Sequence, residues 1–240
     1  MSIRNASVVA ILLATAPIAA PCALLGLALS GCAEPKSTEA APAEPPAVVT
    51  IENPASEPGV TGARQLTFSD RFIKAGEAYF SPDARRIIFQ AVERPTDGSD
   101  PEDFYAMYVC DVVSDGAGDI TGVTNIRRIS PKGSANTCGW FHPTKPNVAL
   151  FASTIGAPTA ENTPGYQRGT SRYRWAFPPE TRIVEVDLAK ADGSTESLRV
   201  LEGDGKAYVA EGSVSPDGRF LLFCSLESGD GDLYIRDLKT

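Results

Sequence analysis

The hydrophobic residues of this chain occur mostly in short runs that are separated by glycine, proline and acidic residues. The clearest example is residues 211–238, where a short apolar strand at 212–214 leads into a Ser-Pro-Asp-Gly turn. A nearly continuous apolar strand follows at 219–225, and a third strand at 233–238. A strand that is apolar at consecutive positions is expected to be covered on both faces. The pattern therefore predicts an all-β fold of antiparallel strands joined by short turns.

The same pattern occurs twice earlier in the chain. Residues 77–90 (EAYFSPDARRIIFQ) align without gaps with residues 211–224 (EGSVSPDGRFLLFC), and residues 138–151 (CGWFHPTKPNVALF) match with one additional residue. Third and fourth strands of these copies are expected at residues 107–111, 126–130, 183–187 and 198–201. Residues 64–68 resemble a further fourth strand that precedes the first copy. A repeat of this length indicates stacked supersecondary units.

The turn residues suit this repeat, because proline fixes φ near the value that a β-turn requires and Asp-Gly suits the end of the turn. Sheets stacked around an axis would cover both faces of each apolar strand, as the blades of a β-propeller do. The strand, the SPDG turn, the apolar strand ending in Phe and the D-[IL]-Y-x-x-D strand resemble the repeat of the TolB-like propeller family over about residues 64–240. The resemblance implies a partial, about three-bladed propeller of four-stranded antiparallel blades.

The number of blades is small for a propeller. The turn-to-turn spacings exceed the roughly 40–45 residues of a typical blade because two insertions lengthen them, so only three blades fit. Closed propellers contain about 4–8 blades. We therefore expect a truncated chain whose remaining blades are missing or, as the less favoured alternative, an open wedge that pairs with another copy.

The N-terminus has the build of a bacterial lipoprotein leader. Arg4 precedes a mostly apolar stretch at 8–29, and Leu-Ser-Gly-Cys at 29–32 resembles a lipobox. The resemblance implies that residues 1–31 are a signal peptide and that Cys32 becomes the lipidated first residue of the mature chain. The alternative is an uncleaved membrane anchor, since the apolar stretch is long enough to span a bilayer.

Proline, alanine and glutamate dominate the segment that follows, residues 32–62. Such a composition cannot bury a core, so we expect a disordered tether that carries a folded region at 63–240. The leader implies a bacterial envelope protein that is anchored by lipid and faces the periplasm. Ala33 stands where many lipoproteins of the inner membrane have aspartate, which favours the outer membrane.

The charge of the chain bears on its partners. Its formal net charge is −8, so its surface does not concentrate nucleic-acid phosphates. The chain has one histidine, His142, whereas most catalytic zinc sites use several imidazole ligands. His142 stands where the other copies have the turn serine, so we interpret it as a turn residue rather than a catalytic base. We expect no cofactor and no metal.

The first insertion, residues 93–103 (ERPTDGSDPED), is strongly acidic. Its carboxylates could ligate calcium, which takes several oxygen ligands from one loop. The spacing matches no defined calcium loop, however. We therefore expect a solvated acidic loop.

The second insertion, residues 157–178, mixes aromatic residues with arginine, a composition enriched at binding interfaces. It either forms a lip that grips a partner protein or a glycan, or folds back over the edge of its blade. Its candidate partner-binding residues are Tyr166, Arg168, Arg172, Tyr173, Arg174, Trp175 and Phe177.

Cys110, Cys138 and Cys224 remain after lipidation of Cys32. Export to an oxidising compartment permits a disulfide. Cys110 ends one third strand and Cys138 opens the next copy, so these two residues are the candidate pair. Cys224 lies in an apolar strand and is expected to be a buried free thiol.

These observations favour a binding scaffold over an enzyme. No G-x-S-x-G motif is present. Glu77 and Glu211 occupy equivalent positions in two copies, which indicates a structural role rather than a catalytic one. The TolB-like resemblance implies envelope protein partners in the periplasm. Similar repeats also occur in the propellers of prolyl-oligopeptidase-type peptidases and in some polysaccharide lyases. The alternative is therefore the N-terminal propeller of such an enzyme, with catalytic residues beyond Thr240.

Substitution of the lipobox cysteine tests the anchor. We expect Cys32→Ala to abolish incorporation of labelled palmitate and to release the protein from the membrane fraction, because it removes the sulfur that carries the lipid. Cys22→Ala is the control and should keep the label, since Cys22 follows proline and makes a poor lipobox. A Cys32→Ala protein that stays labelled and membrane-bound would show the assignment to be wrong.

Overall fold

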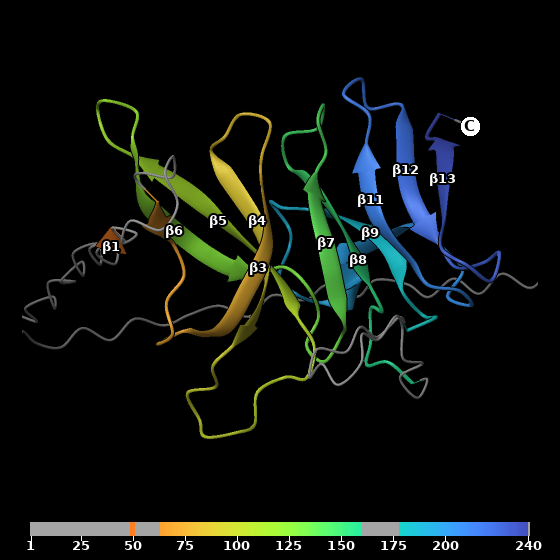
Figure 1. Ribbon diagram of the computed structural model, residues 1–240, viewed down its shortest axis with the longest axis horizontal. Helices are drawn as coiled ribbons and strands as arrows, with labels where there is room; N and C mark the ends of the chain where they lie inside the picture. Colours follow the sequence, from red (N-terminus) through yellow and green to blue (C-terminus); the bar gives the residue numbers. More distant parts are fainter. Residues whose placement is uncertain (1–48, 51–62, 160–177, 240) are drawn as a thin grey trace, which may run out of the picture. The chain divides into compact units, whose positions relative to one another are not determined.

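The computed structural model describes residues 49–50, 63–159 and 178–239. Apart from one turn of 3-10 helix at Thr195–Ser197, the regular elements of these residues are antiparallel β-strands (Figure 1). The predicted all-β class is therefore confirmed. None of the described residues belongs to a helix that is long and apolar enough to span a membrane.

The described strands form three meanders, each with strands paired in chain order, and a separate two-stranded ladder. Sheet I contains β3 (Phe72–Phe80), β4 (Arg86–Glu93), β5 (Ala106–Ser114) and β6 (Ile120–Arg128). Sheet II contains β7 (Asn136–Phe141), β8 (Val148–Ser153), β9 (Arg182–Asp187) and β10 (Leu198–Glu202). Sheet III contains β11 (Val209–Val214), β12 (Phe220–Ser225) and β13 (Asp232–Asp237). The predicted copies thus correspond to sheets.

The segment before sheet I differs from its prediction. β2 covers only Arg64–Gln65 and pairs with β1, Val49–Thr50, instead of with one of the three larger sheets. β1 lies within the segment that was expected to be an unstructured tether. Leu66, which follows β2, packs against the core of sheet I.

The Ser-Pro-Asp turns are held by their own side chains. In sheet I the Ser81 hydroxyl donates to Asp83 Oδ1 at 2.6 Å and accepts the backbone N–H of Arg86 at 2.9 Å. In sheet III Ser215 makes the same two bonds, to Asp217 at 2.5 Å and from the N–H of Phe220 at 2.9 Å. Since both polar side chains close the turn, they have a structural role at both places.

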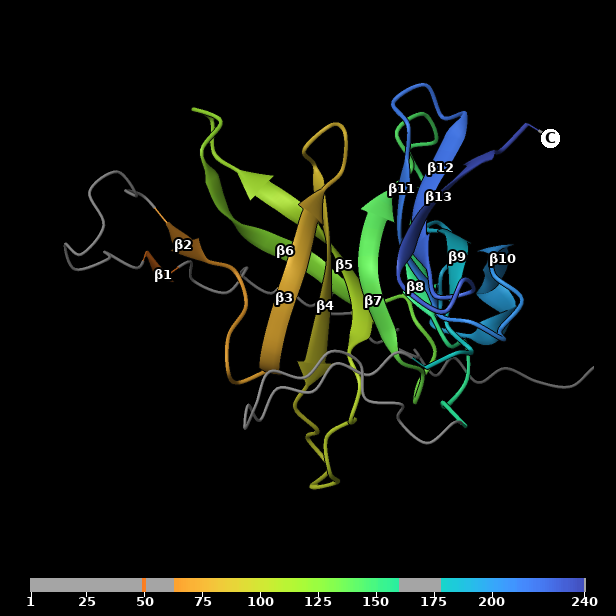
Figure 2. The ribbon, with the colours of Figure 1, turned by 45° about the vertical axis from the view of Figure 1, so that its right-hand side comes forward.

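Sheets I, II and III stack face to face in chain order, with β7 against β3, β4 and β5, and β11 against β7, β8 and β9 (Figure 2). Ile88 of sheet I and Phe151 of sheet II share one core cluster. Leu150, which points to the other face of sheet II, shares the next cluster with Leu221 and Phe223 of sheet III. Successive residues of one strand thus serve two interfaces, which explains the unbroken apolar runs.

The described sheets do not close on themselves. Sheet I has a separate cluster, which includes Phe72, Phe89 and Tyr108, on the face that points away from sheet II. Within the described residues, sheets I and III have no core cluster in common.

Close approach of the sheets depends on glycine at one position of β7 and β11. A Cβ at Gly139 would lie 2.8 Å from Ile88 Cδ1 and 3.0 Å from Met107 Sδ. A Cβ at Gly212 would lie 2.9 Å from Ile183 Cδ1. These distances are shorter than a carbon contact allows, so a larger residue would push the sheets apart.

Gly139→Ala tests this packing. We expect it to lower the free energy of unfolding by about 1–3 kcal/mol, because the new methyl overpacks two fully buried side chains. Gly116→Ala is a matched control, since its Cβ would meet no atom within 4 Å, and should change stability by no more than about 0.5 kcal/mol. Urea unfolding measures both. Equal stability of the two variants would contradict the packing.

Candidate functional site

The first strand of each sheet carries a bulge at the same position. Pairing shifts between Gly76 and Tyr79 in β3, and the corresponding shifts in β7 and β11 begin after Thr137 and Ala210. The residues at the three bulges have positive φ angles: Glu77 (44°), Cys138 (54°) and Glu211 (59°). Left-handed backbone at a residue with a Cβ costs on the order of 1–3 kcal/mol. Its recurrence in each sheet marks a position that the stacking itself requires.

A carboxylate of sheet I accepts hydrogen bonds from the bulge of sheet II. Glu77 Oε2 accepts the backbone N–H of Cys138 at 3.2 Å and the hydroxyl of Thr137 at 3.0 Å. A bulge leaves an N–H without a partner in its own ladder, so the carboxylate of the neighbouring sheet satisfies it.

At the next interface the Cys138 thiol lies close to Glu211, the bulge residue of sheet III. Burial raises the pKa of Cys138 to about 11, and the charges of Glu77 and Glu211 contribute to the rise. The thiol is therefore protonated at neutral pH and is a poor nucleophile. We call Glu77, Thr137, Cys138 and Glu211 the bulge cluster.

Exposed aromatic and apolar side chains lie next to the bulge cluster. The ring of Tyr79 contacts that of Trp140 edge to face, with centroids 5.4 Å apart, and so joins β3 to β7. Phe80 on β3 is also exposed, on the opposite face of sheet I. Burial and the charge of Glu77 raise the pKa of Tyr79, which keeps its hydroxyl a neutral donor. Aromatic surface beside hydrogen-bonding groups is the composition of a binding site.

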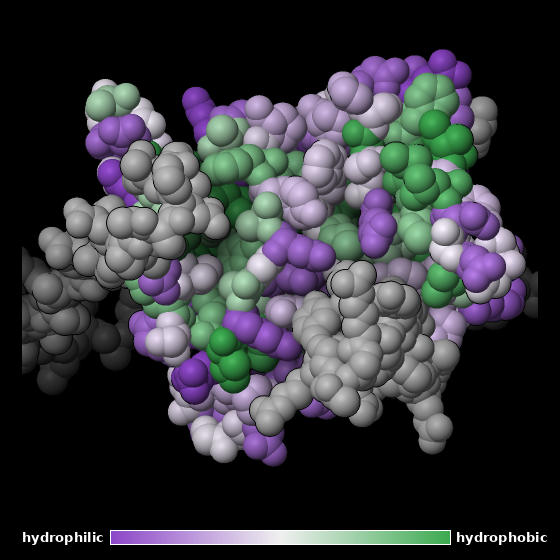
Figure 3. Space-filling model, viewed as in Figure 1, coloured by the Kyte–Doolittle hydropathy of each residue, from purple (hydrophilic) through white to green (hydrophobic). Residues whose placement is uncertain are grey.

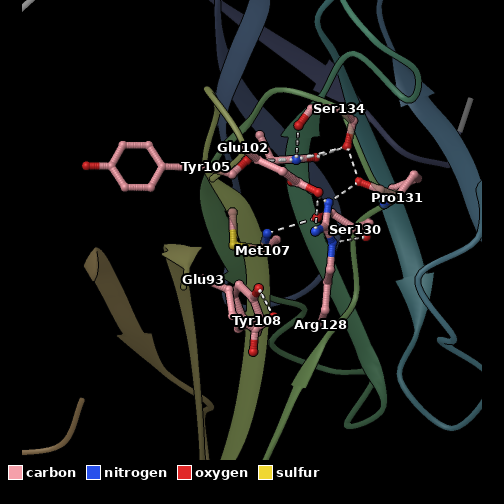
Figure 4. A network of polar contacts seen from close by, with 10 residues as sticks. Glu93, Glu102, Tyr105, Met107, Tyr108, Arg128, Ser130, Pro131 and Ser134 are labelled. Carbon is pink, nitrogen blue, oxygen red and sulfur yellow. Dashed lines mark hydrogen bonds and ion pairs between the residues drawn. The ribbon is translucent and has the colours of Figure 1, made fainter. Parts of the chain in front are cut away.

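Figure 4 shows how the acidic loop is held at one end. Both carboxylate oxygens of Glu102 pair with the guanidinium of Arg128 at 2.9 Å, and that guanidinium also donates to the carbonyls of Ser130 and Pro131. Nearby, the Tyr108 hydroxyl donates to Glu93 at 3.1 Å. These carboxylates stabilise the fold. No group of three or more potential metal-ligating side chains occurs among the described residues.

The same network continues to sheet II. The Ser130 hydroxyl accepts the N–H of Met107 at 2.9 Å, and the Ser134 hydroxyl donates to Pro131 O at 2.7 Å (Figure 4). The amide of Asn136 donates to the carbonyls of Tyr105 and Ser134, each at 2.9 Å. The buried polar groups between β6 and β7 are thus used to connect the two sheets.

His142 lies in the turn between β7 and β8, as its alignment with the turn serines predicts. Its backbone N–H donates to Val148 O at 2.9 Å. Its ring nitrogen Nδ1 accepts the backbone N–H of Thr144 at 3.3 Å. Burial lowers the pKa of His142, and Lys145 lowers it further. A Cβ at Gly218 of sheet III would lie 2.5 Å from Thr144 Oγ1 and 3.2 Å from His142 Cε1, so the two turns are packed together.

The predicted disulfide between Cys110 and Cys138 is not present in the structure, in which Cys110, Cys138 and Cys224 are free thiols. Cys110 points into the core on the face of sheet I that lies away from sheet II. Cys138 lies on the opposite side, beside Glu77 and Glu211. Sheet I therefore separates the two sulfur atoms.

The other predicted site residues lie outside the described part of the chain. They are Cys32, Tyr166, Arg168, Arg172, Tyr173, Arg174, Trp175 and Phe177.

Sequence reasoning missed most of the bulge cluster. It recognised that Glu77 and Glu211 are equivalent, but it interpreted Cys138 only as a disulfide partner. A small residue follows each bulge, namely Ala78, Gly139 and Gly212, and this is the signal that could have marked a close approach.

Comparison with models of known protein families gives no match for this chain. A search of curated proteins likewise gives no significant match. The resemblance to the TolB-like family therefore depends on the repeat residues themselves.

Proposed function

We propose that this chain is a lipid-anchored protein of the bacterial envelope whose TolB-like propeller blades form a scaffold that binds a periplasmic protein or a glycan. The observation that carries the proposal is the recurrence, in all the described sheets, of one turn position and one left-handed bulge. In a propeller, each blade makes the same contacts with its neighbours, and this recurrence is what such an arrangement requires.

The side chains beside the bulge cluster favour binding over catalysis. Tyr79 offers an exposed aromatic ring that contacts Trp140, and Glu77 and Glu211 lie near it as exposed carboxylates. The Cys138 thiol is protonated at neutral pH, as its pKa of about 11 requires. Aromatic rings with neighbouring hydrogen-bond acceptors suit the faces of sugars as well as apolar protein side chains.

The N-terminal region supports the location. A lipid on Cys32 would hold the chain at the membrane, and the Pro/Ala/Glu-rich segment at 33–62 would place the blades in the periplasm. An anchored scaffold needs no high affinity for its partner, because the anchor raises the local concentration.

Photo-crosslinking in intact bacteria tests the binding role. A photoreactive residue in place of Tyr79 should give an adduct on illumination, because this ring is exposed beside the bulge cluster. A protein partner would shift the band on a gel, and a glycan adduct would be removed by a glycosidase. Trp140→Ala should reduce the yield about tenfold, because it removes the ring that contacts position 79.

The matched control carries the photoreactive residue at Asp119, an exposed position in the hairpin between β5 and β6. This position should give no adduct. If positions 79 and 119 behave alike, the surface around Tyr79 is not a binding site and the proposal fails.

A further inference from the structure

The face of sheet III that points away from sheet II is apolar and exposed. Leu222, Leu233 and Ile235 are 44%, 75% and 69% exposed. Leu222 pairs directly with Ile235, and the neighbouring pair of Cys224 with Leu233 extends the same face. Figure 3 shows hydrophobic atoms gathered over β12 and β13. We call this surface the outer face of sheet III.

The corresponding positions in the preceding sheets are covered. Ile88 and Leu150 hold the position of Leu222 in sheets I and II, and both are 0% exposed. Met107 and Ile183 hold the position of Leu233, and both are also 0% exposed. In each case the cover is the next sheet in the stack. The outer face of sheet III therefore has the composition of a sheet-to-sheet interface rather than that of a solvent-facing surface.

The repeated contacts define what the covering sheet must offer. Glu77 accepts the bulge N–H of the next sheet, so the equivalent Glu211 needs a bulge N–H in the same place. Gly139 lies against Met107, and Gly212 lies against Ile183. A small residue must therefore follow the bulge of the covering sheet and lie against Leu233.

Sheet I of this chain has these features. Its bulge residue, Glu77, has a left-handed backbone, and Ala78 follows it as a small residue. Ile87 and Phe89 occupy the positions with which Leu221 and Phe223 pack against sheet II. A groove of about 270 Å³ lies over this face, with Ile87, Phe89, Cys110 and Val123 in its lining. Leu66 packs against these buried residues, so the part of sheet I that is open to a covering sheet is the exposed bulge of β3 at Glu77 and Ala78.

We propose that the outer face of sheet III binds the outer face of sheet I in a second copy of this chain. Glu211 of one copy accepts the N–H of Glu77 in the other, and Leu233 packs on Ala78. The inference rests on the proposed propeller. Two such contacts, related by a twofold axis, join the six sheets that the described residues of two copies form, which lies within the roughly 4–8 blades of closed propellers.

Crosslinking of the full chain in bacteria tests this contact. A photoreactive residue in place of Ile235 should give an adduct of twice the mass of the chain, and mass spectrometry should place the second end on sheet I. Leu233→Arg should lower the yield at least about tenfold, because it places a charge in an apolar contact. Since Leu233 is 75% exposed within one copy, this change should leave the fold intact, as circular dichroism would verify.

Glu211 provides a matched pair of variants. Glu211→Gln keeps an acceptor for the N–H and should retain the adduct, whereas Glu211→Lys should reduce it about tenfold. An adduct with a different protein, or none at all, would overturn the proposal. So would a yield that is unaffected by Leu233→Arg and Glu211→Lys.

The two proposals fail separately. Loss of the dimer adduct, with an intact adduct between position 79 and a molecule other than this chain, would remove the second copy but leave the binding scaffold. An intact dimer adduct without an adduct at position 79 would remove the binding scaffold but leave the contact with a second copy.

Discussion

The left-handed bulge in the first strand of each sheet is the constraint on which the stacking depends. It turns one backbone N–H out of the ladder, where a side chain of the neighbouring sheet can accept it. Glu77 of sheet I accepts the N–H of Cys138, and the Cys138 thiol lies close to Glu211 of sheet III. Each sheet thereby fixes the position of the next.

The bulge also sets the distance between the sheets. The residue after it is Gly139 in sheet II and Gly212 in sheet III, and each glycine lies directly on an apolar side chain of the preceding sheet. With the backbones this close, every second residue of the central strands reaches one interface and the alternate residues reach the other. The ion pair of Arg128 and Glu102 lies at the end of β6 and in the acidic loop.

Much of this fold follows from the sequence, because turns and apolar runs are local signals. Ser81, Ser215 and their partner aspartates close turns at the predicted places. The bulge cannot be recognised in the sequence in the same way, since glutamate and cysteine have no preference for positive φ. The separation of Cys110 from Cys138 could not be predicted either, because their spacing along the chain does not reveal that sheet I lies between them.

Amide hydrogen exchange at Cys138 tests the role of the bulge most directly. If the Glu77 carboxylate holds this N–H, the Cys138 amide should be protected in the native chain. Its exchange should become at least about tenfold faster in Glu77→Ala, while Glu227→Ala leaves it unchanged. Exchange at Cys138 that is equally fast in all three proteins would contradict the bond between the sheets, and with it the account of how they stack.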